Sequence, residues 1–326
     1  MHSDLRHLKN LVKKKSNLTD VSSFHKAINV IFHDIEAKYY DTIHAEMWES
    51  LQQIYDSFFQ NFDFSKYPTL KILDIGCGTG LSTQMLINTP INQHISEIFL
   101  LDTSKVMLEK AKSRLDNGKT RYHLFHGELE ELEEENFDFI LLSSVLHHIP
   151  NLPGFFDEIN KKLKIGGLLF HIHDPNGDAI KNETYLSRVA TLKAEMGNPN
   201  KRFVVRLINK LKRIINGKNP DYIAEVNEIL IKKGIVHMPL ADYEIWSVTD
   251  IHVEDLPYST KKGISIKTLT TQLQGYKLRD AKTYSFYGLM YSKLPKKFKA
   301  KELILFNKDD MNGRNIGCLW ERETRT

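Results

Sequence analysis

The stretch Lys71-Ile72-Leu73-Asp74-Ile75-Gly76-Cys77-Gly78-Thr79-Gly80-Leu81-Ser82 decides the fold class of this chain. Its first half is a short apolar run of the kind that forms a buried strand. Glycines then alternate with other residues, and apolar residues at helical spacing begin at Leu81. Glycine tolerates positive φ angles and lets backbone approach a ligand closely. Because open α/β sheets bind ligands outside the carboxyl ends of their strands, we expect a ligand at this turn.

The spacing of the glycines limits what that ligand is. A dinucleotide fingerprint needs a third glycine, but Leu81 or Thr83 stands there, depending on which glycine starts the count. No Lys-Ser/Thr pair follows the turn, which excludes a Walker A loop. The pattern that fits is acidic-x-Gly-x-Gly-x-Gly, beginning at Asp74. It resembles motif I of the class I S-adenosylmethionine (SAM)-dependent methyltransferases.

Length and composition set broad bounds. The chain has 326 residues and a net charge of only +4, so it can bury a large core and charge alone does not indicate nucleic-acid binding. Two cysteines, Cys77 and Cys318, suggest neither a disulfide framework nor a cysteine metal site. No signal-peptide core is visible in residues 1–15, and no apolar run is long enough for a membrane span. We therefore expect a cytoplasmic protein.

After the glycine turn, apolar runs alternate with helical patterns. Further strands are predicted over 97–102, 121–125, 137–144, 168–174, 275–286 and 315–322. The helix that precedes the fifth strand is predicted to end at Gly166-Gly167. The resemblance is specific over about 70–174 and plausible over 267–324. It implies a Rossmann-like, doubly wound, seven-stranded and mostly parallel α/β sheet with N-terminal helices and a helical lid insertion.

Four segments follow from this interpretation. Residues 1–66 form an N-terminal helical cap, and 67–174 form the SAM-binding core. Residues 175–265 are a helical insertion that covers the acceptor pocket, and 266–326 supply the last strands. A stripe from Met47 to Phe62 has helical period and is expected to pack on the core.

Asp102 ends the second strand, about 20 residues past the glycines, where an acid can bind a ribose diol. The alternative is a helix-capping acid. The resemblance adds Tyr40, from an Ala-x-x-Tyr-Asp segment that covers the cofactor in the family, although a buried structural tyrosine fits as well. It also adds Glu128, where the family usually has an Asp that meets the adenine amine. The predicted cofactor-binding residues are Tyr40, Asp74, Gly76, Cys77, Gly78, Gly80, Asp102, Thr103, Glu128, Leu129 and Ser143.

Methyl transfer from SAM is an in-line displacement, so the enzyme mainly aligns the reactants, and a base is needed only for a protonated nucleophile. The candidate catalytic residues are His148, His173 and Asp174, which follow the fourth and fifth strands. His147 and His171 are further base candidates, and hydrogen-bonded structural histidines are the alternative. No metal site is predicted.

The sequence says less about the methyl acceptor than about the cofactor. An Asn/Asp-Pro-Pro-aromatic motif would indicate amino methylation of nucleic acid, but Ser143-Ser144-Val145-Leu146 stands in its place. We expect a small-molecule or lipid-like acceptor, and the alternatives are an RNA or protein methyltransferase and a SAM-fold binding protein without turnover. A basic amphipathic helix over 201–218 is interpreted as a lid helix, with peripheral membrane contact as the alternative. The sequence leaves the oligomeric state open.

Overall fold

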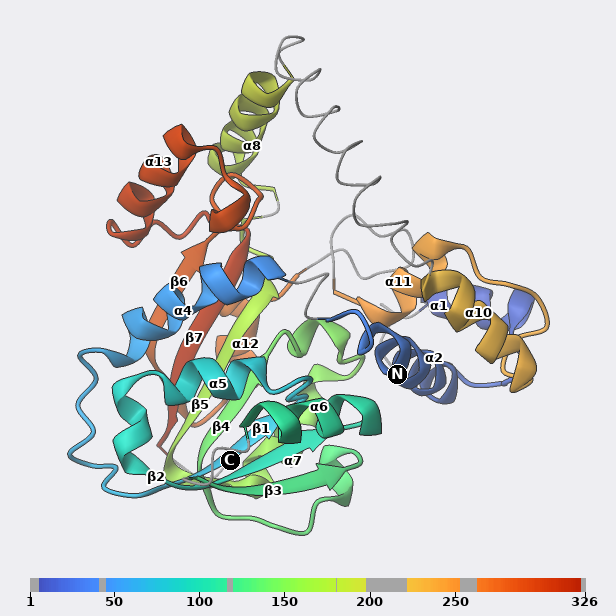
Figure 1. Cartoon of the computed structure of the whole chain (residues 1–326), viewed down its shortest axis with the longest axis horizontal. Coiled ribbons are helices and arrows are strands. Elements are labelled where there is room, and N and C mark those ends of the chain that lie inside the picture. The colour runs from blue at the N-terminus through green and yellow to red at the C-terminus, as the bar shows by residue number, and fades with distance from the viewer. Residues whose placement is uncertain are drawn as a thin grey trace.

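A computed structural model describes residues 6–40, 45–115, 120–179, 181–197, 222–252 and 263–323. Within these ranges the chain forms a seven-stranded sheet with the order β3-β2-β1-β4-β5-β7-β6 (Figure 1). Strand β7 pairs antiparallel with both of its neighbours, and the other pairs are parallel. The predicted seven-stranded, mostly parallel sheet is therefore confirmed. The strands are β1 (Leu70–Ile75), β2 (Ile95–Asp102), β3 (Arg121–His126), β4 (Phe137–Ser143), β5 (Leu163–Pro175), β6 (Tyr276–Tyr284) and β7 (Asn315–Arg322).

Helices cover both faces of the sheet, because successive side chains of a strand point to opposite faces. Ile72 packs on one face with α4, α5 and α6, whereas Leu73 packs on the other face with α7 and α12. The helices are α1 (Arg6–Lys15), α2 (Val21–Glu36), α4 (Ala45–Phe59), α5 (Leu81–Ile87), α6 (Lys105–Leu115), α7 (Leu152–Lys162), α8 (Glu183–Met196), α10 (Tyr222–Lys232), α11 (Asp242–Thr249), α12 (Ile266–Gln272) and α13 (Lys296–Phe306). Short 3-10 turns are η2 (Pro90–His94), η3 (Leu129–Glu131), η4 (Leu146–His148) and η5 (Tyr291–Lys293).

The apolar stripe predicted ahead of the glycine turn forms α4 and packs on the sheet. Its aromatic rings surround Phe170 of β5: the ring centroids of Tyr55, Phe58 and Phe59 lie 5.5, 4.9 and 5.0 Å from that of Phe170. Edge-on aromatic pairs at such distances stabilise a core beyond the area they bury. Helix α4 is thus part of the sheet's own core.

Helices α1, α2, α10 and α11 form a second core, and we call them the four-helix unit (Figure 1). Leu8, Phe24 and Ile28 of the first two helices pack with Val226 and Val248 of the last two. The ion pair between Lys15 Nζ and Glu244 Oε2, at 2.5 Å, adds a link. The unit therefore joins residues from the predicted N-terminal cap and from the predicted insertion.

Helix α8 belongs elsewhere, although it also lies in the predicted insertion. Its Leu192 packs with Phe286 and with Phe298 of α13, away from the four-helix unit (Figure 1). The predicted basic helix at 201–218 lies outside the described residues.

One predicted helix boundary is wrong. Helix α7 ends at Lys162, and Leu163 is already paired with Phe137 in the sheet. The register shifts between Phe137 and Phe139, which face Leu163 and Leu168, so Gly166 and Gly167 occupy an irregularity inside β5. The glycine pair belongs to a bulge in the strand here. Because glycine is also common where helices end, the same sequence pattern resembles a helix end.

Candidate active site

The glycine turn connects β1 to α5 at the carboxyl edge of the sheet. Gly76 and Gly78 have φ angles of 65° and 53°, in the left-handed region that favours glycine. A Cβ on Gly76 would lie 2.8 Å from Cγ2 of Val145, whereas a Cβ on Gly78 would meet no atom within 4 Å. Gly76 is therefore required by packing, and Gly78 faces open space.

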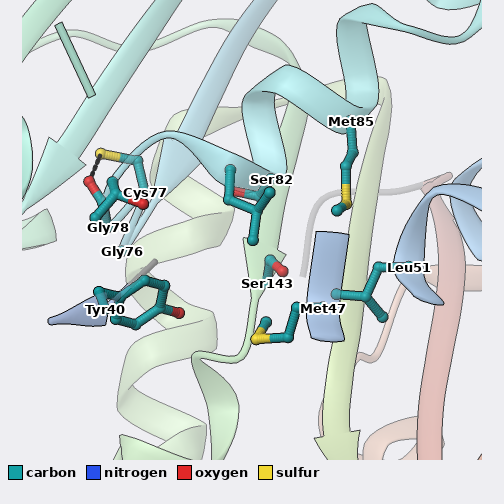
Figure 2. Close-up of a pocket in the computed structure, with 11 residues that line it drawn as sticks. Tyr40, Met47, Leu51, Gly76, Cys77, Gly78, Ser82, Met85 and Ser143 are labelled. Carbon is teal, nitrogen blue, oxygen red and sulfur yellow. Dashed lines mark hydrogen bonds between the residues drawn. The ribbon is translucent and has the colours of Figure 1, made fainter. Parts of the chain in front are cut away.

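That open space is part of a cavity beside the turn (Figure 2). Figure 2 shows Tyr40 across from Gly76 and Gly78, with the Met47 and Ser143 side chains along the cavity. Its lining residues come from α4, the glycine turn, α5, the end of β4 and the segment after α2: Tyr40, Met47, Leu51, Gly76, Cys77, Gly78, Thr79, Leu81, Ser82, Met85 and Ser143. Five predicted site residues are thus brought together, namely Tyr40, Gly76, Cys77, Gly78 and Ser143.

Two acids hold the glycine turn and the start of α5 through hydrogen bonds. Asp74 is fully buried and accepts hydrogen bonds from the hydroxyls of Ser82, at 2.9 Å, and Thr83, at 2.5 Å. Burial raises the pKa of Asp74 to about 7, against the lowering effect of these hydroxyls. Asp102 accepts from the backbone N–H groups of Gly78 and Ser104, each at 2.8 Å. Asp102 therefore fixes the turn and also lies at its edge.

Other predicted cofactor residues lie outside the cavity lining. Gly80 caps α5 with a φ of 79°, and a Cβ there would lie 3.0 Å from Leu115 of α6. The Glu128 carboxylate pairs with Lys26 of α2 at 3.0 Å, and the Leu129 side chain is buried in the core. Thr103 follows β2, and its carbonyl oxygen lies 3.2 Å from Nε2 of His126. These four residues surround the turn region without lining the cavity.

Six lining residues were not among the site residues predicted from the sequence. Met47 and Leu51 were interpreted as core, and both are indeed buried, but their helix also borders the cavity. Thr79, Leu81, Ser82 and Met85 lie within or directly after the glycine turn. Their position next to the motif was a usable signal, whereas nothing in the local pattern of α4 separates core from cavity wall.

The loop after β4 carries two histidines beside two acids. His147 Nδ1 lies 2.9 Å from Oδ1 of the fully buried Asp174, and its Nε2 lies 3.7 Å from Oδ1 of Asp250. His148 Nδ1 lies 2.8 Å from the carbonyl oxygen of Thr249 and 3.4 Å from the same Asp250 oxygen. We call His147, His148 and Asp250 the histidine cluster. Asp250, which caps the C-terminus of α11, was not among the site residues predicted from the sequence.

The charge states of the predicted catalytic residues differ. Although burial acts to raise it, the hydrogen bond from His147 and the nearby His171 ring lower the pKa of Asp174 to about 2. Burial, reinforced by the neighbouring His147 and His33 rings, lowers the pKa of His148 well below 6.5. A carboxylate with so low a pKa is a weak base, and Asp174 is better suited to orienting its histidine partners.

His173 lies apart from this cluster, at the end of β5. Its neighbour Ile172 pairs with Ser143, the residue of β4 that lines the cavity. The His173 Nδ1 atom lies 3.0 Å from the hydroxyl of Tyr284, and the two rings are nearly parallel. His173 also has a φ of 69°, which is uncommon for a residue with a side chain. Such local strain clusters at functional sites.

Residues 73–171, from β1 to β5, match the family described as "Methyltransferase domain". This segment is a class I SAM-dependent methyltransferase domain. The cofactor of this class is SAM, and the matched segment contains the glycine turn, Asp102 and Ser143.

The methyltransferase domain also has curated relatives. The uncharacterized methyltransferase YodH of Bacillus subtilis is 35% identical over 107 residues, which are 32% of this chain and 43% of the relative. Malonyl-[acyl-carrier protein] O-methyltransferase 2 of Ilyobacter polytropus is 26% identical over 161 residues, 48% and 58% of the two chains. Ubiquinone biosynthesis O-methyltransferase of Pelagibacter ubique is 30% identical over 102 residues, 31% and 40%. The matched part of the chain thus spans 40 to 58% of the length of these relatives.

Among the described residues, no helix is long and apolar enough to cross a membrane.

Proposed function

We propose that this protein transfers the methyl group of SAM to a small-molecule or lipid-like acceptor. The observation that carries the proposal is the cavity at the carboxyl edge of β1 and β4, within a methyltransferase domain. SAM supplies an activated methyl group on a sulfonium. The task of the chain is to bind that cofactor, orient the acceptor and exclude water.

The cavity walls suit SAM chemically. Gly78 leaves room for close approach, while Tyr40, Met47 and Met85 offer aromatic and polarisable apolar surface. Asp74 lies just before the turn, and Asp102 lies beside it. Carboxylates at these positions favour a ligand that is positively charged and carries ribose hydroxyls. The described residues therefore fit the cofactor of the family.

The four-helix unit supports a small acceptor. Helix α2 lies against the ligand edge, where the Ser104 hydroxyl donates to Asp34 at 2.5 Å. The ion pair between Lys26 and Glu128 makes a second contact across this edge. Helices that cover the edge restrict access to the cavity, and exclusion of water suits methyl transfer. Two of the relatives are named for small-molecule or carrier-bound chemistry: one for malonyl-[acyl-carrier protein] and one for ubiquinone biosynthesis.

A base is needed if the acceptor arrives protonated, and we propose His173 for it. It follows the β5 residue that pairs with Ser143, so it lies at the same edge as the cavity. The hydroxyl of Tyr284 can hold the ring through Nδ1. His148 and Asp174 are less suited, since the first is bound to Thr249 and the second has a pKa of about 2.

Calorimetry with SAM, S-adenosylhomocysteine and NADH tests the cofactor. Micromolar binding of the first two, on the order of −8 kcal/mol, with no binding of NADH is expected. Binding of NADH in place of SAM would contradict the proposal. Labelled SAM should then be offered with phenols, quinols, free and carrier-bound carboxylic acids, and mixed RNA. Label in a small or carrier-bound acceptor supports the proposal, whereas label in RNA alone would replace it with an RNA methyltransferase.

A further inference from the structure

We propose that the histidine cluster binds a divalent transition-metal ion of the Zn²⁺ class. His147 and His148 come from η4, directly after β4, and Asp250 comes from the end of α11. One ligand atom from each residue can be chosen so that all three lie within 4.8 Å of one another. The inference is independent of methyl transfer, because none of the three residues lines the cavity beside the glycine turn.

The distances suit a small ion. Two ligands bound at about 2.0–2.1 Å in a tetrahedral site are separated by about 3.3 Å. The Asp250 Oδ1 atom lies 3.4 Å from His148 Nδ1 and 3.7 Å from His147 Nε2. Small side-chain rotations, together with a change of tautomer at His148, would place the three atoms around one ion. Two imidazoles and one carboxylate are a ligand set that zinc uses in proteins.

The surroundings of His147 strengthen the inference. Metal-binding histidines commonly donate their other N–H to a carboxylate, which fixes the tautomer and the orientation of the ring. His147 has this arrangement, because Nδ1 lies 2.9 Å from Asp174 Oδ1. With the hydrogen on Nδ1, the lone pair of Nε2 points to the Asp250 side. Asp174 therefore acts as a positioning residue for the proposed ligand.

The carboxylates around the histidine cluster also favour a bound cation. Asp174 is fully buried and the Asp250 side chain is 32% exposed, and both carboxylates lie beside His147. The two carboxylates therefore place negative charge beside the proposed ligand atoms, which favours a cation there.

His148 must change tautomer to take part. Its Nδ1 donates to the Thr249 carbonyl oxygen at 2.8 Å when no ion is bound. Binding through Nδ1 requires the hydrogen on Nε2 and breaks the hydrogen bond to the Thr249 oxygen. The ion would then link the loop after β4 to the end of α11, and so join the sheet to the four-helix unit.

The test uses the full chain, freed of any affinity tag and stripped with a chelator. Zinc competition against a chromophoric chelator should give one tight equivalent per chain. Asp250→Asn and His148→Gln should each weaken zinc binding at least tenfold, whereas His237→Gln, at an exposed histidine outside the cluster, should not. Far-UV circular dichroism and SAM affinity report whether each variant is folded.

A second measurement does not depend on any variant. Co²⁺ bound to the wild-type chain should give the strong visible absorption of a low-coordinate site, and X-ray absorption should detect two imidazoles. Wild-type binding no tighter than that of a folded Asp250→Asn variant would overturn the proposal. An all-oxygen Co²⁺ spectrum, or less than one zinc equivalent, would also overturn it.

Discussion

The cavity at the glycine turn and the histidine cluster occupy the same edge of one sheet, yet they are built in opposite ways. The turn residues Gly76, Gly78 and Ser82 are neighbours in sequence, and their spacing reveals them. The cluster joins His147 and His148 to Asp250, about a hundred residues later. Contiguous sites can be recognised from a motif, whereas sites assembled across a fold become visible only when the distant segments are placed.

The largest expected effect tests the cavity. Gly78→Val should abolish measurable SAM binding, because the added side chain enters open space at the proposed cofactor position. The left-handed backbone, with φ at 53°, adds a strain of roughly 1–2 kcal/mol. Gly166→Val is the matched control, since Gly166 has a φ of 77° and equally open surroundings inside β5. Calorimetry and thermal melting should show similar destabilisation but SAM loss only at residue 78. Unchanged zinc binding by Gly78→Val would separate the two sites.

His173→Gln tests whether His173 is the general base for methyl transfer. Loss of a general base lowers turnover about 100-fold or more. SAM affinity should stay within about twofold, because His173 is absent from the lining of the cofactor cavity. Tyr284→Phe removes the hydroxyl partner of Nδ1 and should lower kcat less while shifting its pH profile. Equal loss of kcat and SAM affinity in His173→Gln would indicate a structural role.

Asp102→Ala should lower SAM affinity about 10- to 100-fold, since a hydrogen bond to a charged group contributes roughly 1.5–3 kcal/mol. The variant also removes the hydrogen bond from the Gly78 N–H group to Asp102, which holds the turn. Asp138→Ala is the control, because Asp138 likewise accepts a backbone N–H, from Lys71. Titration calorimetry on both variants decides the matter. Unchanged affinity in Asp102→Ala would place the ribose contact elsewhere.

The smallest effect concerns pH. The pKa of Asp74 is raised from 3.8 to about 7, so the carboxyl is protonated at pH 6 in the free protein. A cation nearby favours the ionised form, so binding should release a proton. SAM affinity should then rise with pH by up to about tenfold per unit below pH 7 and level off above it. Asp74→Asn should flatten this slope. A flat wild-type profile between pH 5.5 and 8 would show that Asp74 does not sense the cofactor.

Much of the sheet could be predicted from sequence because β1 and β4 are short, mostly apolar runs, as buried parallel strands are, and β5 contains such a run after Gly167. The turn was predictable because its function depends on backbone, and few residues other than glycine permit that backbone. The end of α7 was not, since Gly166 and Gly167 serve a bulged strand as well as they would end a helix.

The cavity wall and the histidine cluster were harder for a different reason. Burial of Met47 satisfies the same helical period whether it faces core or ligand. Asp250 is one acid at a helix end until tertiary packing brings it to His147. Side chains whose role depends on a partner far along the chain leave no local pattern.

The four-helix unit has a consequence for synthesis on the ribosome. Its Lys15–Glu244 ion pair joins residues 229 positions apart, and its core needs α10 and α11 as well as α1 and α2. Helices α1 and α2 therefore emerge long before their apolar faces can be covered, and β1 to β5 leave the ribosome in the interval. During this interval the exposed stripe of Phe24 and Ile28 is a target for chaperones or for aggregation. Yield of the folded protein should thus depend on elongation speed between α2 and α11, well away from either site.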